Sequence, residues 1–496
     1  MKTNSLDFDA QALREKILDL AMRGKLVPQD PNDESASVLL EKIKAEKAEL
    51  IKEKKIKKTK PLPPITDDEK PFDIPDSWEW VRLGDVGNWA AGATPSRKHP
   101  EYYGGNIPWL KTGDLNDDVV EDTTEKITKL GVENSSVKIN KPGNVLIAMY
   151  GATIGKLGIV GNKELVTNQA CCGCTPFNGV YNWYLFYYLF ASRKRLIDLG
   201  SGGAQPNISK QKIENFSFPL PPLSEQSRIA AKIAQLFALL RKVESSTQQY
   251  AKLQTLLKSK VLDLAMRGKL VKQDPNDEPA SVLLEKIKTE KAELVKEKKI
   301  KKSKPLPPIT DEEKPFDIPD SWEWVRLGNI THFVGTGMVV PASKQYNTPK
   351  SNMVPYFKMN NIGNWDGKFN TNNLVYIIED DKTDKYLLKP GQLLFNTRNS
   401  RELVGKTTVV PANLNQKIVS NNNILRIESF HNMKLDYLNY YLISSASRNH
   451  FLKLTTATTN VAAIYQKQLI NCLVPLPPIA EQRRMVNKIL DLYKLI

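Results

Sequence analysis

A long internal repeat is the feature that most restricts what this chain can fold into. Residues 18–84 return 244 positions later as residues 262–328, and only six of the 67 aligned positions differ. The differing pairs are Pro28/Lys272, Ser35/Pro279, Ala45/Thr289, Ile51/Val295, Thr59/Ser303 and Asp68/Glu312. Packing requirements alone would not keep two long segments so similar, so the pattern indicates a duplication. The segment that follows one copy should therefore be the structural counterpart of the segment that follows the other.

A second repeated motif extends the duplication. Residues 219–226 read Pro-Leu-Pro-Pro-Leu-Ser-Glu-Gln, and residues 475–482 read Pro-Leu-Pro-Pro-Ile-Ala-Glu-Gln. With this shift of 256 the last residue, Ile496, aligns with Leu240, whereas Met1 aligns with Ser245. Only residues 241–244 then lack a counterpart, so two similar halves almost close a ring. We expect a pseudo-two-fold molecule whose termini are adjacent.

The formal net charge of +16 suggests nucleic-acid binding, but most of this charge lies in two short segments. Residues 52–60 and 296–304 together hold twelve lysines against two glutamates, which accounts for ten of the sixteen charges. Residues 72–222 carry fifteen basic and fifteen acidic side chains, and residues 316–478 carry seventeen and eleven. Net charge therefore does not make the first globular segment a DNA binder, and an uneven surface distribution would be needed. The lysine runs are equally consistent with solvated helix ends and with phosphate contacts.

Cysteine content and hydropathy favour a reducing, cytoplasmic location. The chain has four cysteines, three of them clustered as Cys171, Cys172 and Cys174. No further His or Cys lies at metal-ligand spacing from this cluster, so a buried apolar strand is favoured over a metal site. Residues 1–10 lack the apolar core of a signal peptide. The longest apolar run, residues 184–191, is too short to span a bilayer, so we expect no membrane association.

Helical and strand-like patterns alternate along the chain. Residues 6–23 predict a helix that Gly24 ends, and residues 37–58 predict a second helix with a lysine-rich end. Short apolar runs cut by Gly, Asn and Pro then predict strands and loops, with a half-buried strand at residues 78–84 and again at 322–328. Matched turns into buried strands occur at residues 141–147 and 389–395, and amphipathic helices at 181–199 and 435–454.

The clearest periodic signal lies between the two strand-rich segments. Apolar residues recur at alternating steps of four and three, which is typical of a coiled-coil seam. The seam positions are Ile229, Ile233, Leu236, Leu240, Val243, Thr247, Tyr250, Gln254, Leu257, Val261 and Leu264. With Ser224 as N-cap and Gly268 as stop, the helix has about 45 residues and a length of roughly 67 Å. Its counterpart is split between Met485, Ile489, Leu492 and Ile496 at one end of the chain and Leu6, Leu13, Ile17 and Leu20 at the other.

We therefore predict an α/β fold in which two similar mixed α/β domains are separated by long antiparallel coiled-coil helices. The predicted parts are repeat helices at 1–71, a first domain at 72–222, spacer helices at 223–315, a second domain at 316–478 and a C-terminal helix at 479–496 that pairs with the N-terminal one.

Motifs for catalysis are absent from the sequence. Residues 151–156 read Gly-Ala-Thr-Ile-Gly-Lys, with three residues between the glycines where a phosphate-binding P-loop needs four. The aligned residues 400–407 have the spacing and lack the first glycine. No Asn-Pro-Pro-aromatic stretch for amino methylation occurs, no nuclease-like carboxylate set is apparent, and His99, His332, His431 and His450 do not cluster. The chain is therefore expected to bind rather than to catalyse.

The predicted architecture suits a protein that reads two short sequences on one DNA duplex, which presents equivalent faces about 34 Å apart. With its two variable domains, residues 219–226 as quoted and Leu-Ala-Met-Arg-Gly-Lys-Leu-Val at 264–271, the whole chain resembles the specificity subunit of type I restriction-modification systems. The C-terminal helix departs from the pattern by ending at Ile496 and by having Ala480 where the central copy has Ser224.

The resemblance implies two target recognition domains that read the halves of a bipartite, asymmetric site in double-stranded DNA. It also implies that the repeat helices dock methyltransferase subunits carrying S-adenosylmethionine, that an ATP- and Mg-dependent restriction subunit joins them, and that this chain binds no cofactor itself. The alternatives are a coiled-coil scaffold without a DNA role and a self-contained nuclease or methyltransferase.

Candidate base-reading residues are the polar and basic side chains of the non-repeating loops, because Arg and Lys suit guanine edges whereas Asn and Gln suit adenine. In the first domain they are Thr94, Ser96, Arg97, Lys98, Lys111, Thr112, Tyr150 and Lys156. In the second domain they are Lys344, Gln345, Lys358, Asn360, Arg398, Asn399, Arg401 and Lys406. Residues 398–401 form the strongest patch, since they are basic and amide-rich in a loop between strands.

Overall fold

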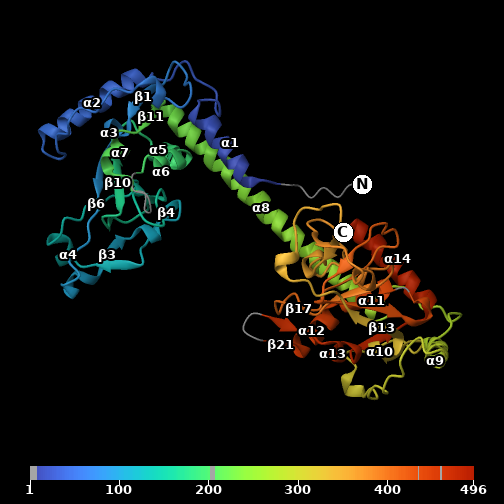
Figure 1. The fold of residues 1–496 in the computed structure, drawn as a ribbon. Coiled ribbons are helices and arrows are strands. Elements are labelled where there is room, and N and C mark those ends of the chain that lie inside the picture. The colour runs from blue at the N-terminus through green and yellow to red at the C-terminus, as the bar shows by residue number, and fades with distance from the viewer. Residues whose placement is uncertain (1–7, 201–206, 434, 458–460) are drawn as a thin grey trace. The chain divides into compact units, whose positions relative to one another are not determined.

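A computed structural model describes residues 8–200, 207–433, 435–457 and 461–496 (Figure 1). The chain divides into two compact units, Met1–Gln248 and Gln249–Ile496. The long helix α8 (Leu223–Met266) contributes its first part to one unit and its last part to the other. No helix among the described residues is both long and apolar enough to cross a membrane.

In the first unit, α1 (Ala10–Met22) packs against the N-terminal part of α8 (Figure 1). The Arg14 guanidinium donates to the Glu244 carboxylate at 3.0 Å, whereas Asp33, beyond the end of α1, accepts from Arg228 at 2.7 Å. Since Arg228 precedes Glu244 in α8, the two helices run antiparallel. Asp9 caps α1 by accepting a hydrogen bond from the Ala12 N–H at 2.9 Å.

The described strands of the first unit form three sheets. A five-stranded sheet has the order β2-β10-β7-β8-β4, a four-stranded sheet the order β5-β3-β9-β6, and β1 pairs with β11. The strands are β1 (Glu79–Arg82), β2 (Gly87–Ala91), β3 (Tyr103–Leu110), β4 (Asp118–Val120), β5 (Glu125–Ile127), β6 (Ile139–Asn140), β7 (Val145–Ala148), β8 (Leu157–Val160), β9 (Leu165–Thr167), β10 (Cys171–Pro176) and β11 (Ser217–Leu220). The pairs β3·β9 and β4·β8 are parallel, so the sheets are mixed.

Helix α5 (Asn182–Ala191) packs on β7 and β8 of the five-stranded sheet. Besides α1, α5 and α8, the described helices of the first unit are α2 (Ala36–Lys52), α3 (Leu83–Val86), α4 (Lys129–Glu133), α6 (Arg193–Asp198) and α7 (Lys210–Glu214). β7 and β8 are buried along their whole length, which explains their continuous apolar sequences. Val145 and Ile147 enter the core under α5 and α8, whereas Leu146 enters a smaller core on the other side.

The second unit has a similar construction. Its strands are β12 (Glu323–Arg326), β13 (Thr331–Thr336), β14 (Met353–Phe357), β15 (Val375–Ile378), β16 (Leu393–Asn396), β17 (Arg398–Asn399), β18 (Thr407–Val409), β19 (Val419–Ser420), β20 (Ile424–Ser429), β21 (Thr456–Ala457), β22 (Ala462–Ala463) and β23 (Leu473–Leu476). They form sheets of order β13-β20-β16-β18, β15-β14-β19, β17-β22-β21 and β12-β23. Its helices are α9 (Ala280–Lys296), α10 (Leu327–Ile330), α11 (Leu435–Leu442), α12 (Ser445–Leu454), α13 (Gln466–Ile470) and α14 (Ile479–Leu495).

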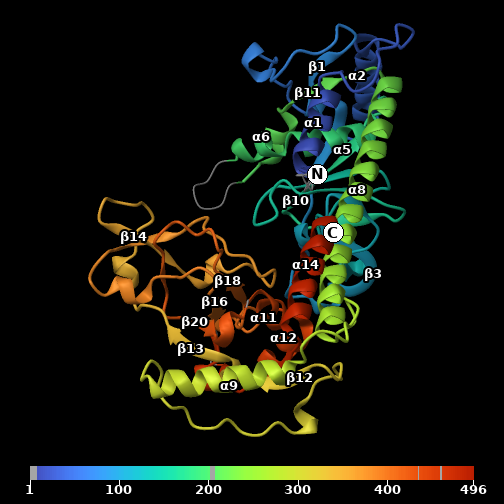
Figure 2. The ribbon, with the colours of Figure 1, turned by 90° about the vertical axis from the view of Figure 1, so that its right-hand side faces the viewer.

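α14 lies along the C-terminal part of α8, as Figure 2 shows. The Tyr493 hydroxyl donates to the Lys258 carbonyl at 3.2 Å, and Glu481, at the start of α14, accepts from Trp322 at 2.9 Å and contacts Gln273. Because Gln273 follows Lys258 in the chain, α14 runs antiparallel to α8.

The repeated sequences make repeated contacts. The Trp78 indole donates to the Glu225 carboxylate at 2.9 Å in the first unit, and Trp322 donates to Glu481 at 2.9 Å in the second. Both carboxylates are buried, and that burial raises their pKa values. Together with the strands and helices described above, these repeated contacts confirm the predicted mixed α/β class and show a similar plan in each unit.

The two helices predicted from the N-terminal repeat are shorter than expected. α1 begins at Ala10 rather than residue 6, which lies outside the described residues, and Gly24 follows it with a φ of 66°. α2 ends at Lys52, so the lysine-rich run does not continue the helix. Lys54 has a φ of 60°, and Ile56 turns back to pack on the core, which explains the early end.

The part of the chain that the structure describes covers the predicted seam of α8 near its two ends. Ile229 and Ile233 are fully buried and Val261 is 9% exposed, whereas Val243 and Tyr250 are 44% and 61% exposed. Among the described residues, α1 covers the first part and α14 the last. The predicted partners of the middle of the helix include residue 6, outside the described residues, so a continuously paired coiled coil stays a prediction there. The predicted adjacency of the termini involves Met1, outside the described residues, and stays a prediction.

Candidate nucleic-acid interface

In the first unit, loops from four places in the sequence meet at one end of the sheets. The Ala93 N–H donates to the Thr167 carbonyl at 2.9 Å, Asn168 N–H to Leu110 O at 2.9 Å, and Met149 N–H to Ala170 O at 2.7 Å. These bonds join the segments that follow β2, β3, β7 and β9. We call residues 92–99, 111–117, 149–156 and 168–170 the first loop cluster, and all eight candidates of the first domain lie in it.

Two candidates of the first cluster converge on a residue that the sequence analysis missed. Gln169, between β9 and β10, is exposed, and its amide oxygen accepts a hydrogen bond from the Thr94 hydroxyl. The Tyr150 side chain is also hydrogen-bonded to Gln169, and partial burial raises the pKa of Tyr150. Gln169 is a polar residue in the loop after the buried strand β9, and the chosen candidates also lie in loops after strands. This sequence signal could have identified Gln169.

Arg97 and Lys111 share one carboxylate. The Arg97 guanidinium donates to Glu125 at 2.9 Å and the Lys111 ammonium donates to it at 2.7 Å. Arg97 also lies over the rings of Tyr103 and Trp109, 4.2 and 5.2 Å from their centroids. Hydrogen bonds from Lys111 and then Arg97 outweigh burial and lower the pKa of Glu125. The pair therefore presents two ordered cations with a net charge of +1.

The remaining candidates of the first cluster differ in exposure. Ser96 and Lys98 are exposed, and the Ser96 hydroxyl accepts from the Lys98 N–H at 3.4 Å. Thr112, in the 3-10 helix η3 (Thr112–Asp114), and Lys156 are half-buried.

The second unit repeats the arrangement with different side chains. The Met338 N–H donates to Ser420 O at 2.7 Å, Asn421 N–H to Phe357 O at 2.9 Å, and Thr397 N–H to Asn423 O at 2.8 Å. These bonds join the segments that follow β13, β14, β16 and β19. We call residues 337–345, 358–366, 397–402 and 421–423 the second loop cluster.

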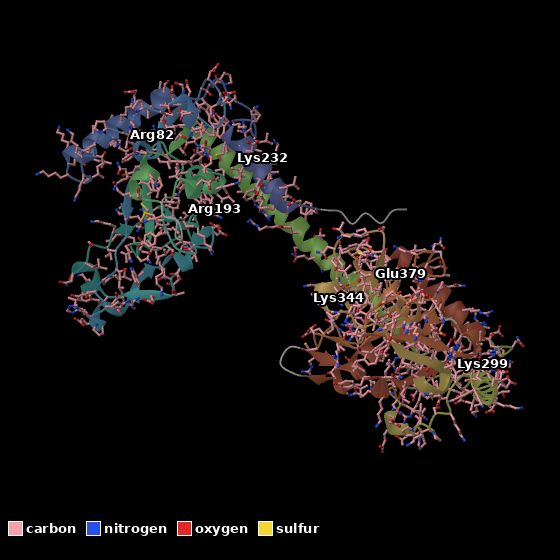
Figure 3. All side chains as sticks on the ribbon, in the orientation of Figure 1. Arg82, Arg193, Lys232, Lys299, Lys344 and Glu379 are labelled. Carbon is pink, nitrogen blue, oxygen red and sulfur yellow. The ribbon has the colours of Figure 1, made fainter. Side chains whose placement is uncertain are left out.

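Lys358 and Gln345 are brought together in the second cluster. The Lys358 ammonium donates to the Gln345 amide oxygen at 2.9 Å, and the Gln345 amide donates to Val340 O at 2.9 Å. Lys344, labelled in Figure 3, and Asn360 are exposed. Lys358 thus contacts a neutral amide where Lys111 contacts a carboxylate, so the two clusters differ in local charge.

The patch at residues 398–401 lies beside β22. Arg398 and Asn399 form β17, which pairs with Ala463 and Ala462, and Arg401 is exposed in the loop that follows. The Asn399 amide donates to Asn396 Oδ1 at 2.9 Å. Asn421, Asn422 and Asn423, a run of amides that the sequence analysis did not select, lie in the same cluster.

Lys406 is placed differently from the other fifteen candidates. Its side chain is buried, with the residue 2% exposed, and its ammonium donates to Ile362 O at 2.8 Å and to Asn364 Oδ1 at 3.0 Å. Burial lowers the pKa of Lys406. The structure thus separates Lys406 from the surface on which the other candidates of the second unit lie.

The cysteine cluster occupies β10, an interior strand of the five-stranded sheet. Cys171, Cys172 and Cys174 are fully buried, and this burial raises the pKa values of all three thiols. The expectation of a buried strand is confirmed. Within the described ranges no group of three or more His, Cys, Asp or Glu side chains is placed to hold a metal ion.

Comparison with known proteins identifies both units. A family model described as the type I restriction modification DNA specificity domain matches residues 75–254 and 319–496. The type I restriction enzyme EcoAI specificity subunit of Escherichia coli is 34% identical over 98% of this chain and 89% of its own.

Two solved structures share the fold. The HsdS subunit from Thermoanaerobacter tengcongensis has a TM-score of 0.51 and 22% identity, over 86% of this chain and 91% of that one. A chain from a structure of complex assembly and conformational transition in the type I R-M system has a TM-score of 0.56 and 21% identity, over 86% and 92%.

Proposed function

The chain belongs to the type I restriction-modification DNA specificity family, and on this premise we propose that each of its loop clusters reads one half of a bipartite, asymmetric site in double-stranded DNA. The chain is the non-catalytic specificity subunit. We assign the target recognition domains to residues 72–222 and 316–478.

One observation carries this proposal: the two clusters have the same backbone joins and different side chains. The joins Ala93–Thr167 and Met338–Ser420 hold corresponding loops, at 2.9 and 2.7 Å. Side chains in the major groove read base identity. Two domains that recognise different half-sites can therefore share one backbone arrangement, provided that their side chains present different donors and acceptors.

The proposed readers are the sequence candidates that lie at the surface of the clusters, extended by Gln169, Asn422 and Asn423. Arginine and lysine present donors suited to guanine, whereas asparagine and glutamine can pair with adenine in bidentate fashion. Lys406 is left out because its ammonium is occupied inside the domain. Arg97 and Lys111 are held in fixed positions by Glu125, and preordered side chains lose less entropy on binding.

The proposal extends to the spacer and the partners. We propose that α8 acts as the spacer that sets the separation of the half-sites, and that the repeat helices dock methyltransferase subunits. S-adenosylmethionine, ATP and Mg would then be bound by the methyltransferase and restriction subunits. Support comes from the naming of the EcoAI relative as part of a restriction enzyme and from the structure of complex assembly that shares the fold.

The proposal is tested by selecting bound sequences from a pool of randomised duplexes with the purified full-length chain, alone and with its methyltransferase subunits. Two short conserved segments separated by an unread gap are expected. A folded protein that enriches no sequence would overturn DNA reading and leave a coiled-coil scaffold as the better description.

A point substitution sharpens the test. Arg401→Ala should weaken binding to the selected site by about 1–3 kcal/mol while binding to unrelated DNA changes less. Arg483→Ala, which also removes one arginine but lies on α14 and outside both clusters, is the matched control. An unchanged ratio of specific to non-specific affinity would remove Arg401 from the readers.

A further inference from the structure

The loops that follow β3 and β7 are cross-linked by an arginine that belongs to neither. Arg193 is the first residue of α6 (Figure 3). Its Nε donates to the Gly155 carbonyl at 2.8 Å, and its guanidinium also bonds and forms an ion pair with the Asp117 carboxylate. One side chain thereby holds together two of the four segments of the first loop cluster.

The two loops are shaped to receive this side chain. Asp117 has a φ of 64°, and its carboxylate also accepts the Leu157 N–H at 2.9 Å. Gly155 has a φ of 77°, and a Cβ on it would lie 3.0 Å from Arg193 Cγ. A left-handed non-glycine residue costs about 1–2 kcal/mol, so contacts with its side chain are needed to offset that cost.

The second unit makes the corresponding cross-link with a different residue. The buried Lys406 ammonium donates to Ile362 O at 2.8 Å and to Asn364 Oδ1 at 3.0 Å, and so ties the segment before β18 to the loop after β14. The Trp365 indole adds a second tie by donating to Glu402 O at 2.9 Å. A cation therefore connects corresponding loops in both units. These loops follow β3 and β7 in the first unit and β14 and β16 in the second.

We propose that Arg193 and Lys406 are positioning residues for DNA recognition: each fixes two reading loops of its own unit against each other, without itself contacting a base. This proposal rests on the proposed function. Lys406 is 2% exposed and cannot reach a phosphate without unfolding its surroundings. Two loops locked together present their side chains at one spacing, and base discrimination depends on that spacing.

A purely structural role would leave the choice of a cation unexplained. Lys406 is buried and loses its hydration, whereas the Arg193 side chain is 29% exposed. For a buried cation, a hydrophobic side chain of similar volume is often as stabilising or more so. What an apolar residue cannot supply is the pair of directed hydrogen bonds that Lys406 makes to the loop after β14. Nor can it replace the bonds of Arg193, which go to two separate loops.

The test compares base preferences of full-length variants in the randomised-duplex selection. Arg193→Gln and Asp117→Asn remove opposite ends of the first cross-link, and Lys406→Met removes the second. We expect the first two variants to lose discrimination about tenfold, the equivalent of one bidentate base contact, across several base pairs of one half-site. Lys406→Met should do the same in the other half-site, and each variant should keep the sequence preference of the untouched half.

Lys194→Gln, which neutralises the exposed neighbour of Arg193, and Lys467→Met, on α13, are the matched controls and should select the wild-type site. If Arg193 instead contacts a phosphate, Arg193→Gln will weaken binding to all sequences and Asp117→Asn will strengthen it. If the cross-links serve stability alone, thermal midpoints will fall while base preferences stay unchanged. Either outcome overturns the proposal and leaves the proposed function standing. A wild-type chain that selects no site overturns both.

Discussion

Arg82 shows how the repeated sequence is converted into repeated contacts. It is 4% exposed and donates to the carbonyls of Pro63 and Pro64, at 3.0 and 2.7 Å, and to both oxygens of Glu69, at 2.7 and 2.8 Å. Arg326 makes the same set of bonds with Pro307, Pro308 and Glu313 in the second unit. Each arginine fastens a proline-rich segment to the first strand of its unit.

These contacts predict how the stability of the fold depends on pH. The hydrogen bond from Arg82, followed by that from the Thr66 N–H, lowers the pKa of Glu69 from 4.5 to about 2. Since the folded-state pKa lies below the unfolded one, the stabilisation is complete above pH 4.5 and is lost as the pH falls towards 2. Glu69→Gln should therefore reduce stability at pH 7 by about 1 kcal/mol, because the carboxylate is 38% exposed and screened, and by less near pH 2.

Denaturant unfolding at pH 7, 4 and 3 measures this difference. Asp68→Asn removes the same charge from an exposed neighbour and should leave the pH dependence unchanged. An equal loss of stability for Glu69→Gln at all three pH values would show that the carboxylate's ionisation is not responsible.

At single positions the sequence could not separate buried from exposed cations. Lys156 and Lys406 both follow a glycine at aligned positions, yet Lys156 is half-buried and Lys406 is 2% exposed. The difference depends on Ile362 and Asn364, which are more than forty positions from Lys406 in the sequence. Side chains brought together by long-range pairing cannot be identified from local letters.

At the scale of elements, α8 shows which features of a helix its apolar periodicity can predict. The spacing of apolar residues correctly predicted a helix of about 45 residues, and α8 has 44. It also predicted a continuously paired seam, which stays a prediction for the middle of the helix around Tyr250. A periodic pattern records the chemistry of one helix face and contains no information on whether another helix reaches it.

Glycines that allow strands to approach closely are a further feature of these elements. A Cβ on Gly92 would lie 2.1 Å from Thr167 O, and one on Gly337 would lie 2.3 Å from Ser420 O. The segments after β2 and β13 can therefore cross the segments after β9 and β19 only without side chains at these positions.

Gly92→Ala should lower the free energy of unfolding of the first unit by about 1–3 kcal/mol, because backbone atoms must move apart. Gly113→Ala is the control: a Cβ there meets no atom within 4 Å, so a change within about 0.5 kcal/mol is expected. Thermal unfolding of the two variants decides the matter, and equal midpoints would contradict the close approach.

At the scale of the whole molecule, the repeat was the most informative signal. It predicted that the segments after the two copies would have the same plan, and the units Met1–Gln248 and Gln249–Ile496 do. It did not predict their differences. β17, β21 and β22 form a small sheet in the second unit, whereas the described residues of the first unit have a bridge between Tyr150 and Asn207 at this place. Such differences lie in the non-repeating loops, which the proposed function assigns to DNA reading.

The role proposed for α8 predicts the effect of changing its length. Residues 245–250 are exposed, so four alanines inserted after Thr247 should extend the helix without disturbing either core. The insertion adds about 6 Å at the usual helical rise, which corresponds to roughly one to two base pairs of duplex. The selected site should then keep both half-site sequences and gain that many base pairs in the unread gap.

The same four alanines inserted between the exposed Lys163 and Glu164 lengthen a surface loop of the first unit and should leave the gap unchanged. A constant gap in both variants would mean that the separation of the half-sites is set elsewhere, because a spacer that is one continuous helix cannot gain a turn and keep its length.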